Sequence, residues 1–143
     1  MYESIVVGTD GSATAEKAVE HAAELAKTLK AKVHVVSAYE PGSVKVGGGF
    51  EERSQWMASP NATVDSVLER AVGMIRVKGI DVEIYARKGD AAEALLEVAE
   101  ECQADLIIVG NKGMTGTRRF LLGSVPDKVS HHAPCSVLII RTV

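Results

Sequence analysis

The chain has 143 residues, a net charge of −3 and 46% apolar residues. Nucleic-acid binders are usually basic, so this charge argues against that class, and no apolar run approaches the about 18 residues of a membrane span. The length predicts one domain, 1–143, with one sizeable core. The N-terminal residues MYES lack the features of a signal peptide, so we expect a cytoplasmic protein. Cys102 and Cys135 lie in apolar segments, which predicts two buried thiols rather than a disulfide.

Short β-branched runs alternate with segments of helical periodicity along the chain. The runs predict strands over Ser4–Thr9, Lys32–Tyr39, Ile80–Arg87, 106–110 and Ser136–Ile140. Apolar stripes of helical spacing predict helices over Thr14–Lys30, Ala62–Lys78 and Val125–His132, and another that follows the capping box Asp90–Glu93 and extends to Cys102. The segment Glu40–Pro60 has many glycines and few large apolar groups, which predicts a mobile flap with part of Phe50–Met57 helical.

This alternation predicts an α/β fold of the Rossmann-like kind. Right-handed crossovers give an open, doubly wound, five-stranded parallel sheet, and the order 3-2-1-4-5 is the one we expect. The first and fourth strands are then central neighbours whose following helices leave to opposite faces. A ligand crevice is expected at their carboxyl ends, next to Asp10 and Gly110.

A glycine-rich segment follows the apolar run Leu106–Val109. Its spacing is Gly110-x2-Gly113-x9-Gly123-Ser124, with Arg118 and Arg119 between the last two glycines. Glycine permits close approach to the backbone, and the helix that begins at Gly123-Ser124 offers free amides to an anion. A phosphate-bearing ligand is therefore predicted here; the alternative is that these glycines serve only a surface turn.

The sequence resembles the universal stress protein family along essentially its whole length. The resemblance is carried by Val6-Val7-Gly8-Thr9-Asp10-Gly11-Ser12, by the glycine spacing continued to Val125, and by Pro134-Cys135-Ser136-Val137-Leu138-Ile139-Ile140. The spacing matches the ATP-binding motif of that family, Gly-x2-Gly-x9-Gly-Ser/Thr. The resemblance implies a homodimer in the cytoplasm that binds ATP or another adenine nucleotide, with Mg²⁺ as a candidate companion.

The resemblance also implies roles for individual residues. Asp10 would hold the ribose or a metal, and the backbone of Ala38 would meet the adenine. Val109, Gly110 and Gly113 would lie along the ribose and phosphates, while Gly123, Ser124 and Val125 would donate to the phosphates. Gly8 stands where many relatives carry an apolar residue or proline beside the base.

Other kinds of site have weaker support in the sequence. His131 and His132 are adjacent on a helix and point in different directions, with no cysteine or carboxylate cluster to complete a metal site. Ser12 and Ser124 lack the Gly-x-Ser-x-Gly context of a hydrolase nucleophile. A receiver domain would need paired acids after the first strand, where Asp10 stands alone. The sequence favours a nucleotide-binding regulatory or stress protein with little turnover over a slow ATP hydrolase or nucleotide-transferring enzyme, and a dimerisation module without a ligand is a third reading.

The last strand predicts the dimer contact. In the order 3-2-1-4-5 it is an edge strand, and Val137, Leu138, Ile139 and Ile140 make it apolar on both faces without a proline. An edge of this kind tends to recruit another strand. Two copies meeting antiparallel across a two-fold axis would pair both edges; the alternative is that helices and the flap cover Val137–Ile140 within one chain.

Overall fold

The computed structural model describes residues 1–39, 62–111 and 122–142. The expected flap Glu40–Pro60, with its helical part, lies outside the described residues. The elements in chain order are β1 (Ser4–Gly8), α1 (Ala13–Leu29), β2 (Lys32–Tyr39), α3 (Ala62–Arg76), β3 (Val82–Lys88), α4 (Ala91–Glu101), β4 (Leu106–Gly110), α5 (Ser124–His132) and β5 (Ser136–Ile140).

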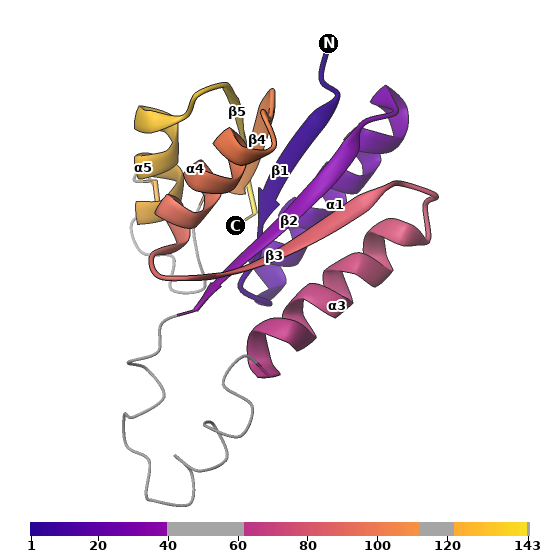
Figure 1. Ribbon diagram of the computed structural model, residues 1–143, viewed down its shortest axis with the longest axis horizontal. Helices are drawn as coiled ribbons and strands as arrows, with labels where there is room; N and C mark the ends of the chain where they lie inside the picture. Colours follow the sequence, from indigo (N-terminus) through magenta and orange to yellow (C-terminus); the bar gives the residue numbers. More distant parts are fainter. Residues whose placement is uncertain (40–61, 112–121, 143) are drawn as a thin grey trace, which may run out of the picture.

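The strands form one parallel sheet in the order β3-β2-β1-β4-β5. This confirms the predicted α/β class and the order 3-2-1-4-5. Helices α1 and α3 cover one face of the sheet, and α4 and α5 cover the other (Figure 1). The carboxyl ends of β1 and β4 are therefore neighbours, as the sequence predicted.

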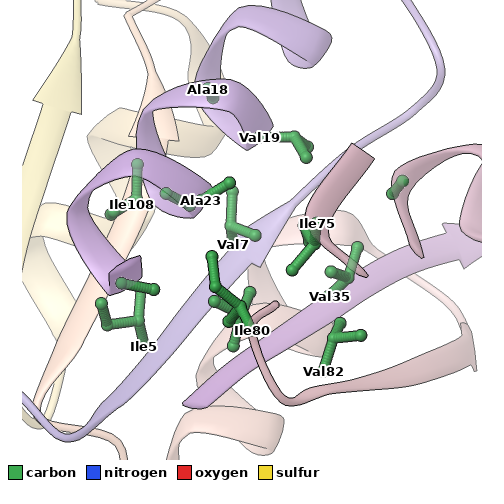
Figure 2. Close-up of a cluster of buried hydrophobic side chains, with 14 of the residues drawn as sticks. Ile5, Val7, Ala18, Val19, Ala23, Val35, Ile75, Ile80, Val82 and Ile108 are labelled. Carbon is green, nitrogen blue, oxygen red and sulfur yellow. The ribbon is translucent and has the colours of Figure 1, made fainter. Parts of the chain in front are cut away.

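The central strands are buried on both faces. Along β1, Ile5 and Val7 pack under α1 while Val6 packs under α4, and all three side chains are fully buried. Figure 2 shows the first of these two cores, where the small side chains Ala18 and Ala23 let α1 lie close to β1 and β4. Alternation across fully buried strands explains the unbroken apolar runs in the sequence.

Most element boundaries lie within one or two residues of the prediction. Helix α1 begins at Ala13, one residue early, because the Ser12 hydroxyl caps it by accepting from the amide of Ala15 at 3.1 Å. Helix α3 ends at Arg76 rather than Lys78, since the chain turns there and reaches Gly79 at a φ of +77°. The capping role of Asp90 is confirmed, because its carboxylate accepts from the Glu93 amide at 3.0 Å.

The two edges of the sheet differ in character. Strand β3 exposes Glu83 and Lys88, and the half-buried Arg87 pairs with Glu101 of α4 through two contacts of 2.7 Å. Charged side chains of this kind discourage pairing with another strand. Strand β5 carries no charge and leaves Leu138 39% exposed, while Val137 and Ile139 are half-buried under the α4–α5 layer. Within the described residues, β5 is the apolar edge.

The cysteines differ in part from the prediction. Both thiols are free, as expected, but Cys102 and Cys135 are half-buried rather than buried. Each lies at the border of the α4–α5 core rather than inside it. Burial raises the pKa of Cys135, and the nearby negative charge of Asp105 raises it further. The thiol of Cys135 is thus held in its neutral form.

A hydrogen-bonded polar cluster lies near the start of β2, at the end of the sheet opposite to the crevice. The buried ring of His34 places Nδ1 2.8 Å from the hydroxyl of Tyr85, which donates to Glu83 at 2.7 Å. Lys32 donates to the other oxygen of Glu83 at 2.9 Å. Since the single hydroxyl proton of Tyr85 goes to Glu83, we assign the proton of His34 to Nδ1. Burial lowers the pKa of His34, and the charge of Lys32 lowers it further, against the opposing effect of Glu83 and Asp81.

This lowered pKa predicts a pH dependence of stability. The unfolded chain takes up a proton on His34 near pH 6.5, before the folded chain does. The free energy of unfolding should therefore fall as the pH is lowered from about 7 to 5.5. Urea unfolding of His34→Gln should show a shallower fall over this range than the natural chain, whereas His132→Gln, at an exposed site, should follow the natural chain. Equal slopes for the natural chain and His34→Gln would contradict the assignment.

Candidate functional site at the carboxyl ends of β1 and β4

The carboxyl ends of β1 and β4 lie side by side at the point where the sheet changes its winding direction. Val7 pairs with Ile108 in parallel register, and the helices that follow, α1 and α5, lie on opposite faces. In doubly wound sheets this switch point is where a ligand crevice is expected. Its described sides would be the turn after β1, Asn111 and the start of α5.

The turn after β1 is held by its own side chains. The amide of Thr9 continues the ladder to the carbonyl of Val36 at 3.0 Å, and the Thr9 hydroxyl accepts from Gly11. The carboxylate of exposed Asp10 accepts from the Ser12 amide at 2.9 Å. Gly11 has a φ of +85°, and a Cβ there would come within 2.7 Å of Val67. The turn therefore requires glycine, and it fixes Asp10 at the edge of the crevice.

Gly8 has a packing role that the sequence did not reveal. A Cβ on Gly8 would lie 3.1 Å from two methyl groups of Leu95 in α4. The absence of a side chain at this position thus lets α4 approach the sheet. Ala38, at the end of β2, is half-buried against the same core.

The end of β4 can present only its backbone to a ligand. The side chain of Val109 is 4% exposed and belongs to the α4–α5 core. Gly110 follows it, and the amide of Asn111 extends the ladder to the carbonyl of Ile140 at 2.8 Å. Any contact from Val109 or Gly110 to a bound molecule would therefore use main-chain atoms.

The N-terminus of α5 lies directly beside the end of β4. The amide of Gly123, the N-cap residue, donates to the carbonyl of Asn111 at 2.9 Å. The amide of Asp127 donates back to Gly123, and Pro126 has no amide hydrogen. The amides of Ser124 and Val125 are left as the helix donors without an intrahelical acceptor, so they are the groups that an anion could bind.

A surface contact ties α5 to α4 near this end. The ammonium of Lys128 lies 3.5 Å from Asp90 and 3.6 Å from Glu93, in the first turn of α4. The second turn of α5 is thereby joined to the start of α4 on the same side of the sheet. This contact adds to the packing that fixes where the α5 amides point.

The structure brings together most of the residues that the sequence singled out. Val109 and Gly110 adjoin Gly123, Ser124 and Val125 across the Asn111–Gly123 hydrogen bond. Asp10 follows the neighbouring strand β1, and Gly8 and Ala38 lie at the ends of β1 and β2. Gly113, Arg118 and Arg119 lie outside the described residues.

Sequence reasoning missed Asn111 and Thr142. Oδ1 of Asn111 accepts from the amide of Thr142 at 2.8 Å and from its hydroxyl at 3.1 Å. The available signal was a polar amide placed immediately after a fully buried strand. A polar residue at the carboxyl edge of a parallel sheet can form hydrogen bonds to the segments that border the site.

The donor set fits Mg²⁺ only in company with a ligand. Among residues 1–39, 62–111 and 122–142, no group of three or more His, Cys, Asp or Glu side chains is placed to hold a metal. Mg²⁺ is commonly held by one or two carboxylates together with substrate phosphates. The exposed carboxylate of Asp10 fits that pattern, with the phosphates as the remaining ligands.

Comparison with known proteins agrees with this architecture. The model of the universal stress protein family matches residues 1–141. The chain belongs to the universal stress protein family. A universal stress protein of Mycobacterium tuberculosis, Rv1636, is 35% identical, with 99% of this chain and 97% of that protein covered. A universal stress protein of Methanocaldococcus jannaschii, MJ0531, is 31% identical, with 99% of this chain and 83% of that protein covered.

Solved structures of universal stress proteins share the fold. One, described as a complex with cAMP, is 34% identical with a TM-score of 0.77, covering 99% of this chain and 98% of that chain. A universal stress protein from Archaeoglobus fulgidus in complex with dAMP is 26% identical with a TM-score of 0.71, covering 98% of both chains. In this member of the family, no described helix is both long and apolar enough to cross a membrane.

Proposed function

We propose that this chain binds an adenine nucleotide, ATP or a relative of it, at the crevice between β1 and β4. The proposed role is regulatory, in a stress response, with little turnover. The observation that carries the proposal is the N-terminus of α5, held beside the end of β4 with two donor amides. The relatives solved with cAMP and dAMP support an adenine nucleotide as the occupant.

Each proposed contact follows from what the local structure leaves available. The amides of Ser124 and Val125 would bind a phosphate, and the backbone of Val109 and Gly110, continued by Gly113, would line the ribose and phosphates. Gly123 would contribute through its position, since its amide already donates to Asn111. Asp10 would hold the ribose or a Mg²⁺ ion, and Ala38 and Gly8 would border the adenine.

Little turnover is part of the proposal because the described carboxylates near the crevice have protein partners. Asp10 accepts from the Ser12 amide, and Asp90 caps α4 and contacts Lys128. Asp127 lies 3.7 Å from His131. The proposal gives each of these carboxylates a structural or ligand-holding role and assigns none of them as a general base. A steady release of inorganic phosphate from ATP by the purified protein would favour the hydrolase instead.

We also propose a homodimer in the cytoplasm, formed through β5. The support for the dimer is the uncharged β5 edge with exposed Leu138, which contrasts with the charged edge on β3. Antiparallel pairing of two β5 strands would satisfy both edges at once. The family resemblance is the support for the cytoplasmic location.

The nucleotide proposal predicts the effect of removing one helix donor. Ser124 is the first residue of α5, where proline is tolerated, and Gly123 before it has the extended backbone that proline requires, with ψ at 167°. Ser124→Pro removes an amide and a hydroxyl while keeping the helix. Calorimetric titration should show ATP bound about 10- to 100-fold more weakly than by the natural chain.

Ala91→Pro is the matched control for this experiment. Ala91 is the first residue of α4, and Asp90 before it is also extended, with ψ at 138°. This variant should bind ATP as the natural chain does, because α4 has no phosphate-binding role. Equal affinities of Ser124→Pro and Ala91→Pro, or a natural chain that binds no adenine nucleotide, would refute the proposal.

The dimer proposal predicts different effects of one substitution at the two edges. Leu138→Lys places a charge on β5, and Ile84→Lys places the same charge on β3, where the side chain is similarly exposed, at 45% against 39%. Sedimentation at micromolar concentrations should show a dimer for the natural chain and for Ile84→Lys, and a monomer for Leu138→Lys. A natural chain that sediments as a monomer at tens of micromolar would rule out the dimer.

A further inference from the structure

The segment that follows β5 is anchored next to the candidate nucleotide site. Thr142 is 2% exposed, and both its amide and its hydroxyl donate to Oδ1 of Asn111. Its carbonyl accepts from the ammonium of Lys17, in α1, at 3.1 Å. Polar groups at this depth cost free energy when they lack partners, so the three contacts hold the segment in place.

Asn111 links this segment to α5. Its backbone amide donates to Ile140 of β5, its side chain accepts from Thr142, and its carbonyl accepts from the amide of Gly123. One residue thus joins β5, the segment after it and the N-terminus of α5 to the end of β4. The contact to Gly123 is the described hydrogen bond that fixes how the first amides of α5 lie relative to the β4 backbone.

We infer that Asn111 is a positioning residue for the phosphates, and that Thr142, by holding its side chain, makes phosphate affinity depend on the segment that continues from β5. The inference rests on the proposed function. Helix amides bind an anion well only when they are held close to the productive geometry. If Asn111 is released from Thr142, its backbone is held to β5, among the described contacts, by the ladder bond to Ile140 alone, so its carbonyl, the Gly123 amide and the Ser124 and Val125 amides are less firmly placed.

A consequence is that the edge strand and the nucleotide site are mechanically connected. The carbonyl of Ile140, the last residue of β5, is bonded to Asn111, and Thr142 is two residues further along. A partner that pairs with β5 would therefore restrain the same segment that positions the phosphate amides. Nucleotide affinity is then expected to respond to occupation of that edge.

The test uses single substitutions and ATP titration, with unfolding midpoints measured alongside. Thr142→Val removes the hydroxyl and keeps the shape and the amide, and Thr142→Ser keeps both donors. The matched control is Thr28→Val, which removes a hydroxyl bonded to the Glu24 carbonyl at 3.2 Å near the far end of α1. We expect ATP affinity about three- to tenfold lower for Thr142→Val, lower still for Asn111→Ala, and unchanged for Thr142→Ser and Thr28→Val.

The outcomes separate this inference from the proposed function. If the natural chain binds no adenine nucleotide, the proposed function fails. If the natural chain binds ATP and Thr142→Val binds it equally well, the inference is overturned whatever happens to Asn111→Ala. A loss in Thr142→Ser as large as that in Thr142→Val would also overturn it, because the retained hydroxyl should restore the contact.

Discussion

The burial of β1 and β4 on both faces is the constraint on which the rest of the structure depends. Their side chains alternate between two cores, so a shift of either strand by one residue would move each apolar set into the other core, where its packing does not match. That fixes the register Val7 to Ile108, and with it the relative position of Asp10 and Gly110. The packing of the strand core thereby determines where the polar residues at the strand ends lie, although those residues are outside the core.

The two ends of the sheet differ in which helix ends lie there, and this difference favours an anion at the carboxyl ends of β1 and β4. A cavity of about 430 Å³ at the opposite end is lined by several lysines, including Lys27, Lys30 and Lys78. Helices α1 and α3 end there, so their last carbonyls give that end a negative partial charge. Lys30 ends α1 in a left-handed conformation, and Lys78 pairs with Glu24. These lysines therefore compensate helix ends, whereas the crevice at the other end receives the amino end of α5.

Much of the fold and part of the site could be predicted from the sequence. The buried strands, the cap Asp90 and the switch point follow from local patterns and the handedness of the crossovers. The role of Gly8 against Leu95 could not be predicted, because it depends on how closely α4 packs. Two further features could not be predicted: the Gly123 amide donates to Asn111, and Asn111 accepts from Thr142. Both depend on hydrogen bonds between segments that are distant in sequence.

The central claim is that the α5 amides beside the end of β4 bind the phosphates of an adenine nucleotide. A crystal structure of the protein with ATP tests it most directly. The account predicts a phosphate oxygen within about 2.7–3.2 Å of the amide nitrogens of Ser124 and Val125, with the ribose toward Asp10. A nucleotide bound elsewhere, such as in the lysine-lined cavity at the opposite end of the sheet, would contradict it.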